Sequence, residues 1–406
     1  MIPQEQQKFE KKQKSLYYGI DFTNGLRRVL TNAIGLIYFL SLGFGVIETT
    51  SLFSISMIFL IAFEFITGPV ADHVSRKLSV IISFVLMGIS FLGIFIFTNF
   101  WLLALFWILD DIAWTFQSGA NTAWIIDTLK YGKHKSNLAK LFSRVYFFEK
   151  SGRVIGSLIG LFVIAISFRS IWLVIALANF IMAFFLWKNM EERNFKPDRS
   201  NKNLILKTWL KTKQAFLFIF NKKHFEFRGM VIAMVIANLW YVFLYTAVPL
   251  VLKETYKLSP DKISGVFILI GVCLLAGPFI GEKSFHRFGA RNSLFFGFLL
   301  VTILEIVFVL TNSLILAIAC LGILEMTMVG TDISFDATIQ HKIKSHVRAS
   351  IGSAMSICWS LAYAAATFFT GFSIVKLGLV PTIWISVGFA FITAFAYRYS
   401  IKVKIK

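Results

Sequence analysis

The sequence is dominated by about twelve apolar runs, each close to the roughly 20 residues that a helix needs to cross the hydrocarbon core of a bilayer. The expected membrane spans are residues 15–41, 48–70, 79–98, 102–126, 141–166, 171–187, 230–252, 263–282, 294–310, 313–338, 350–375 and 380–399. With 57% hydrophobic and only 15% charged residues, the chain has too little polar surface for a soluble globule. The sequence therefore predicts an all-α membrane protein.

One long polar stretch, residues 188–229, interrupts the apolar runs and carries eleven Lys or Arg against four acids. It divides the expected spans into two halves of six, residues 1–187 and 230–406. Within it, apolar residues recur at helical spacing, which predicts an amphipathic helix at the inner membrane surface. These residues are Leu206, Trp209, Leu210, Leu217 and Phe220.

The net charge of +20 could indicate a nucleic-acid partner, but the basic residues are concentrated in every second loop, on the side expected to face the cytoplasm. The expected outer loops contain only Arg169, Lys253, Lys257, Lys262 and Lys376. This is the positive-inside pattern of membrane proteins. We therefore expect both termini in the cytoplasm, a location in the inner (plasma) membrane, the lipid bilayer as a partner and no nucleic acid.

Motifs for catalysis, cofactors and metals are missing from the sequence. Cys273, Cys320 and Cys358 are isolated from one another, and all six histidines fall in expected cytoplasmic loops. The chain has no P-loop, dinucleotide fingerprint or serine-hydrolase elbow. We expect no enzyme activity, no metal and no cofactor.

Polar residues on the expected span 102–126 repeat at spacings of three and four, so they share one face of a helix. They are Asp110, Trp114, Gln117, Asn121 and Trp124. Ionisable groups in a membrane are costly and usually serve a pathway or a partner. This face is expected either to line the substrate cavity or to form a buried polar seam between helices.

A second acidic face lies on the span 313–338, where Glu325, Asp332 and Asp336 are seven and four residues apart. Neighbouring carboxylates in a low dielectric favour proton binding by one of them. Asp336, nearest to the cytoplasm, is alternatively a solvated residue. The expected proton carriers are Glu325, Asp332, Asp110 and Glu64, with Glu325 and Asp332 also in the substrate cavity.

The expected spans 15–41 and 141–166 combine bases with acids. The first carries Asp21, Asn24, Arg28, Thr31 and Tyr38, and the second carries Glu149, Lys150 and Arg153. The bases can neutralise acids of other helices, and we expect Asn24 and Arg28 in the cavity. The series Gly152, Gly156 and Gly160 predicts close helix packing. Tyr241 and Tyr245 add aromatic faces that can hold a cation.

The segment Gly68-Pro-Val-Ala-Asp72-His-Val-Ser-Arg76-Lys77 resembles the loop between helices 2 and 3 of the major facilitator superfamily (MFS), roughly G-x-x-x-D-R-x-G-R-K. A degraded second copy spans Gly281 to Arg291. Further similar segments end at Asp127 and begin at Arg348. They resemble a bacterial group of the superfamily whose members are uncharacterised or drug-efflux-like. The resemblance implies the MFS fold: twelve transmembrane helices in two pseudo-symmetric six-helix halves.

The resemblance also implies a cytoplasmic charge cluster that latches the two halves. Its members here would be Gly68, Asp72, Arg76, Lys77, Asp127 and Arg348. Asp72 could be stabilised by the positive N-terminus of the helix that begins near residue 350. The alternative for Arg76 and Lys77 is an ordinary role in setting topology.

Together these features predict a monomeric secondary active transporter that works by alternating access. The preferred function is proton-coupled export of small amphipathic or cationic compounds. One alternative is a proton symporter that imports a nutrient or anion, bound by Arg28, Lys150 or Arg153. Another is a membrane sensor that transports nothing.

Overall fold

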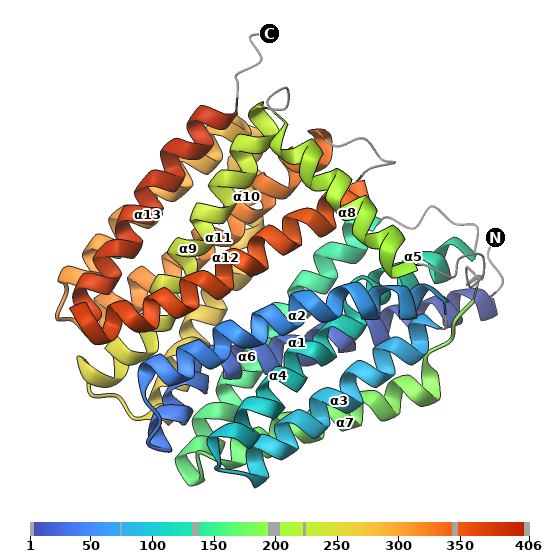
Figure 1. Ribbon diagram of the computed structural model, residues 1–406, viewed down its shortest axis with the longest axis horizontal. Helices are drawn as coiled ribbons and strands as arrows, with labels where there is room; N and C mark the ends of the chain where they lie inside the picture. The colour runs from blue at the N-terminus through green and yellow to red at the C-terminus, as the bar shows by residue number, and fades with distance from the viewer. Residues whose placement is uncertain are drawn as a thin grey trace. The chain divides into compact units, whose positions relative to one another are not determined.

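The computed structural model describes residues 4–73, 75–131, 138–193, 204–221, 225–342 and 348–401, and these residues are almost entirely helical (Figure 1). The helices are α1 (Gln4–Ser41), α2 (Val46–His73), α3 (Arg76–Ile96), α4 (Phe100–Gln117), α5 (Ala120–Tyr131), α6 (Leu138–Ile166), α7 (Ser170–Asn189), α8 (Leu204–Phe220), α9 (Phe225–Glu254), α10 (Pro260–Leu310), α11 (Leu314–Lys342), α12 (Arg348–Leu377) and α13 (Leu379–Ser400).

The twelve expected spans are all accounted for by these helices. Nine segments of the described residues are long and apolar enough to cross a membrane by length and composition, with α4 and α5 together forming one of them. α10 contains two spans, because its helical geometry is broken at Gly289, where φ is 71°. α1 and α6 complete the set, since intramembrane charges such as Arg27 and Glu149 lower their hydropathy. The prediction of a twelve-helix membrane protein is confirmed.

The fourth span differs from the single helix expected over residues 102–126. α4 ends at Gln117 and α5 begins at Ala120. Gly119 between them has φ of 78°, a left-handed conformation that glycine adopts without the Cβ clash of other residues. The polar face predicted from continuous helical spacing is therefore interrupted after Gln117.

The chain forms two compact units. The first contains residues 1–31 and 55–207, and its helix α3 packs against α4 and α7 (Figure 1). The second contains residues 32–54 and 208–406, in which α9 packs against α12 and α13, and α10 packs against α11. The beginning of α2 is tied to the second unit by Ser54, whose hydroxyl donates to the Ala364 carbonyl at 2.7 Å. The division at residues 188–229 stays a prediction.

The polar stretch contains the helix α8 at the expected position. Trp209, Leu210, Leu217 and Phe220 are all largely exposed, whereas Ile219 is buried. Exposed aromatic and aliphatic residues on one helix are typical of a surface that meets lipid or a partner. Placement of α8 at the inner membrane surface stays a prediction.

Candidate functional site

α1 and α6 approach so closely that only glycine fits at their contact. A Cβ atom at Gly152 would lie 2.1 Å from the Phe22 carbonyl oxygen, and one at Gly25 would lie 2.0 Å from the Glu149 carbonyl oxygen. A Cβ at Gly156 would lie 3.0 Å from Leu26 backbone atoms. The predicted close packing is confirmed for Gly152 and Gly156. This contact places the charged residues of α1 beside those of α6.

Glu149 of α6 is the centre of one charge cluster. Arg153 donates to its carboxylate at 2.7 Å, and the Lys150 ammonium lies 3.0 Å from its other oxygen. Asp21 and Arg28 of α1 interact electrostatically with Glu149. Two of the three bases proposed to bind an anion, Lys150 and Arg153, are therefore already paired with a carboxylate.

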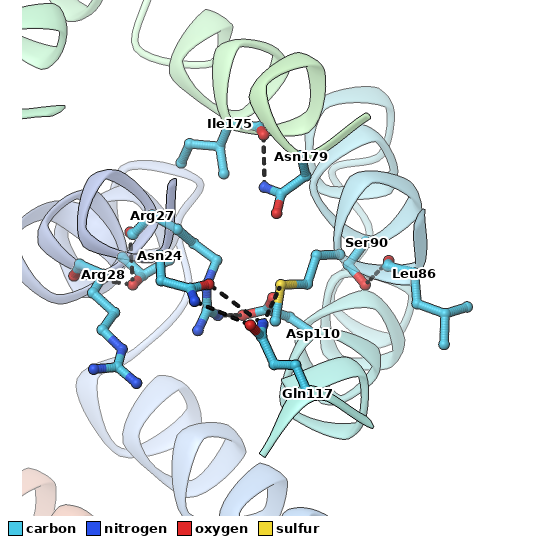
Figure 2. A network of polar contacts seen from close by, with 11 residues as sticks. Asn24, Arg27, Arg28, Leu86, Ser90, Asp110, Gln117, Ile175 and Asn179 are labelled. Carbon is cyan, nitrogen blue, oxygen red and sulfur yellow. Dashed lines mark hydrogen bonds and ion pairs between the residues drawn. The ribbon is translucent and has the colours of Figure 1, made fainter. Parts of the chain in front are cut away.

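Arg27 and Asp110 form a buried ion pair between α1 and α4 (Figure 2). Each side chain is only 8% exposed. The pair is joined through Oδ2 of Asp110. Two buried polar atoms of the pair have no hydrogen-bond partner among the described protein atoms: Oδ1 of Asp110 and Nε of Arg27. Polar atoms left over in a buried pair can bind water or a ligand. The sequence analysis missed Arg27, although its position next to Arg28 was visible.

The amides of Asn24 and Gln117 bond to each other beside this ion pair (Figure 2). Asn24 Nδ2 donates to Gln117 Oε1 at 3.0 Å, and Gln117 Nε2 donates to Asn24 Oδ1 at 3.3 Å. Two residues predicted to line a cavity are thus brought together and are buried. Their reciprocal bonds also match the polar seam that was the alternative interpretation of this face.

Arg28 has a different environment from Arg27. Its side chain extends away from the Asp110 and Gln117 network (Figure 2). The Arg28 guanidinium lies 4.3 Å from the centroid of the Trp114 ring, and the guanidinium of Arg27 lies 5.4 Å from the same centroid. No carboxylate lies within ion-pair distance of Arg28 in the described part of the chain. The Trp114 face that was expected to hold a substrate cation is therefore covered by a cation of the protein itself.

The remaining residues of the predicted polar face lie beyond the break at Gly119. Asn121 is buried, and its side-chain oxygen has no partner among the described protein atoms. Trp124 is fully buried in an apolar cluster with Tyr17, and its Nε1 donates to the Glu191 carbonyl at 2.8 Å. Trp124 is therefore a structural residue in this unit and does not continue the polar face of α4.

An aromatic cluster on α9 lies beside the acid of α11 in the second unit. Tyr241 and Tyr245 are stacked with ring centroids 4.4 Å apart, and Trp240 meets both rings edge-on. Tyr245 interacts electrostatically with Glu325, which is half-buried. Within the described residues, Glu325 forms no ion pair with Lys or Arg. The structure thus combines an uncompensated carboxyl with stacked aromatic faces.

The other acids on α11 lie on a more open surface. Asp332 and Asp336 are exposed in the second unit, and both interact electrostatically with Tyr397 of α13. Glu64 on α2 is half-buried, and one oxygen of its carboxyl has no partner among the described protein atoms. These residues stay candidates for proton binding.

Glu305 on α10 is an acid that the sequence analysis missed. Its residue surface is 0% exposed. Trp240 Nε1 donates to its Oε2 at 2.9 Å, and Ser386 of α13 is hydrogen-bonded to its Oε1. A single glutamate within the apolar run 294–310 was the available signal, because an isolated acid in a membrane span is rarely without a role.

Charged residues also meet at the expected cytoplasmic end of the first unit. Arg76, at the start of α3, forms an ion pair with Asp127 of α5. Glu192 accepts from the Arg76 backbone N–H at 2.8 Å and from the Ser75 hydroxyl at 2.6 Å, so it caps the positive end of α3. Of the other proposed latch residues, Lys77 is half-buried. Gly68, Asp72 and Arg348 lie outside the residues whose surroundings are described.

Metal ligands do not gather in the part of the chain that the structure describes, where no group of three or more His, Cys, Asp or Glu could hold an ion. What the geometry offers is polar and charged groups held inside membrane-spanning helices. Such groups can bind a solute or a proton and release it without covalent chemistry.

Comparison with solved structures shows the same fold in several transporters. A mutant form of the nucleoside transporter NupG has a TM-score of 0.76 and 14% identity, with 97% of this chain and 100% of that chain covered. The human organic anion transporter MFSD10 (TETRAN) has a TM-score of 0.69 and 11% identity, with 96% and 99% covered. A bacterial homologue of the human lysosomal transporter Spinster has a TM-score of 0.69 and 14% identity, with 100% of both chains covered.

Comparison with curated protein sequences gave no match. The family description "Major Facilitator Superfamily" matches residues 20–367, which is most of the chain. The match covers α2 to α11 entirely and most of α1 and α12, so it spans both compact units. The chain therefore belongs to the Major Facilitator Superfamily and is a multi-pass secondary transporter.

Proposed function

We propose that this transporter exports small amphipathic, cationic compounds in exchange for protons. The single observation that carries the proposal is the site on α9 and α11, where Glu325 lies beside the stacked rings of Tyr241 and Tyr245. Aromatic faces attract cations, and a carboxyl without a basic partner can bind either a cation or a proton. Competition between the two for Glu325 would couple their movements in opposite directions.

The polar groups of the first unit support a division of roles. Asp110 is neutralised by Arg27, and Trp114 is covered by Arg28. These groups are less available for a substrate cation than Glu325. We therefore assign Asn24, Gln117 and Asn121 to polar contacts with the substrate, and Glu325 and Asp332 to proton coupling.

The direction of transport and the membrane placement rest on the sequence. Export is supported by acids that lie near aromatic residues in the sequence and by the resemblance to a bacterial group with uncharacterised or drug-efflux-like members. Cytoplasmic termini and a location in the inner membrane follow from the basic inner loops. We further propose that the protein acts as a monomer and that Arg76 and Asp127 belong to its conformational latch.

Proton flux in proteoliposomes tests the function directly. Vesicles with a pH dye inside receive lipophilic cations, anionic metabolites or sugars, each added separately. We expect proton flux with lipophilic cations in the wild type and its loss in Glu325→Gln, which keeps the side-chain size but removes the titrating group. Glu282→Gln is the matched control, because the Glu282 side chain is 72% exposed and its replacement should leave flux unchanged.

Import of an anion with a proton is the second candidate, and Arg28 is the observation that favours it. Lys150 and Arg153 are paired with Glu149, whereas Arg28 has no ion-pair partner within the described residues. Flux with anionic metabolites alone, lost in Arg28→Gln, would replace the cation-export proposal. The absence of proton flux with every compound would favour a sensor that transports nothing.

A further inference from the structure

Glu305 lies in the second unit, and its hydrogen-bond partners in the described part of the chain are Trp240 and Ser386, neither of which is a base. It is completely buried by α9, α10 and α13. Within the described residues no Lys or Arg forms an ion pair with it. A carboxylate that is removed from water without a cation is strongly disfavoured relative to its neutral acid.

The hydrogen bonds around Glu305 constrain where the protons of this group can lie. Ser386 Oγ is bonded both to Glu305 Oε1 and to the Ile383 carbonyl oxygen, the latter at 2.7 Å. A serine hydroxyl has one proton and can donate it only once. The Ile383 carbonyl can only accept, so if the hydroxyl donates to it, the hydrogen between Ser386 and Glu305 must come from the carboxyl group.

The neutral acid satisfies every one of these contacts. Trp240 Nε1 donates to the Glu305 carbonyl oxygen at 2.9 Å, the Glu305 O–H donates to Ser386, and Ser386 donates to Ile383. In the ionised form the Ser386 hydroxyl would have to donate to Glu305, and its 2.7 Å contact with the Ile383 carbonyl oxygen would then lack a hydrogen. Burial and hydrogen-bond supply therefore favour the same protonation state.

We propose that Glu305 is a second proton-binding site of this transporter, occupied at neutral pH and held by Trp240 and Ser386. The site is linked to the proposed substrate site, because Trp240 also meets Tyr241 and Tyr245 edge-on. Loss of the proton would turn the Ser386 hydroxyl from the Ile383 carbonyl toward Glu305, because the carboxylate could then only accept. It would also place a negative charge next to the tryptophan that supports the aromatic pair.

The titratable groups of the neighbouring helices do not compensate for Glu305. Among the described residues, Tyr245 of α9 interacts with it electrostatically and carries no positive charge. On α13, Tyr397 interacts with Asp332 and Asp336 of α11. The proton on Glu305 is thus governed by its local hydrogen bonds and by burial.

Infrared spectroscopy of the protein in lipid vesicles at neutral pH tests this assignment without any substrate. The wild type is expected to show the C=O stretching band of a buried carboxylic acid that is lost in Glu305→Gln. Glutamine reproduces the proposed bonds, since its oxygen accepts from Trp240 and its amide donates to Ser386, so this variant should fold normally. Glu282→Gln is the control, because an exposed carboxyl contributes no band of a buried acid.

Trp240→Phe gives a second readout that does not depend on Glu305→Gln folding. Removing the N–H donor should shift the acid band to higher wavenumber, because the carbonyl loses a hydrogen bond. Identical acid bands in the wild type and whichever of the two variants folds would overturn the proposal. Since no transport is measured, this failure would leave the proposed function of Glu325 untouched.

Discussion

Breaking the Arg27–Asp110 ion pair is expected to destabilise the protein more when the base is removed than when the acid is removed. Both side chains are 8% exposed, and loss of one partner from a buried pair typically costs about 3 to 5 kcal/mol. In Asp110→Asn, Arg27 retains an electrostatic interaction with the neighbouring Asp111. We therefore expect the free energy of unfolding to fall by an amount near the lower end of this range, about 3 kcal/mol.

Arg27→Gln leaves a less favourable arrangement. Asp110 and Asp111 then lie next to each other, and Asp110 retains only its longer-range interaction with Arg28. Two adjacent acids repel each other in a low dielectric, so the loss should approach about 5 kcal/mol at neutral pH. Lowering the pH should restore part of the stability of this variant, because protonation removes the uncompensated negative charge.

Unfolding of the purified protein in mild detergent provides the assay. The double variant Arg27→Gln/Asp110→Asn should lose about 2 to 3 kcal/mol less free energy of unfolding than the sum of the single variants, because neither member of the pair is left charged without the other. Glu191→Gln is a control that breaks the exposed Arg193–Glu191 pair, where the side chains are 40% and 42% exposed. Its cost should stay below about 1 kcal/mol.

Two results would refute this reasoning. If each single variant lowers the free energy of unfolding as little as Glu191→Gln does, the Arg27–Asp110 pair is not buried in the membrane protein. A larger loss for Asp110→Asn than for Arg27→Gln would show that Asp111 does not compensate for the missing carboxylate.

Two further predictions concern helix packing and the cytoplasmic ion pair. Gly152→Val should destabilise by about 1 to 3 kcal/mol through overpacking, since a Cβ there would lie 2.1 Å from the Phe22 carbonyl oxygen. Gly388→Val, with nothing within 4 Å of its Cβ position, should unfold like the wild type, and equal losses in both variants would contradict the α1–α6 contact. Asp127→Asn should cost no more than about 1 kcal/mol, because its partially exposed pair with Arg76 is only weakly stabilising. It should nevertheless slow substrate exchange in proteoliposomes with little change in binding affinity, and unchanged turnover would remove this pair from the latch.

The charged network of the first unit could be predicted only in part. The sequence indicated that Asp110, Gln117, Asn24 and Arg28 are functional candidates, because their helical spacing is a local property. It could not indicate that Asn24 pairs with Gln117, because these residues are 93 positions apart and the pairing depends on how α1 and α4 are rotated. The same limit explains why Arg27 was missed as the partner of Asp110.

Helix count, membrane class and the glycine contact were determined by the sequence itself. Apolar runs of sufficient length specify spanning helices, since the backbone must satisfy its hydrogen bonds within each helix in lipid. The Gly152 series specifies close packing because only small side chains permit it. Tertiary structure alone decided that Arg28 covers Trp114 and that Glu305 is buried against Trp240 and Ser386. Hydrophobicity is a property of consecutive residues, whereas these contacts depend on the rotation and register of helices that are distant in the chain.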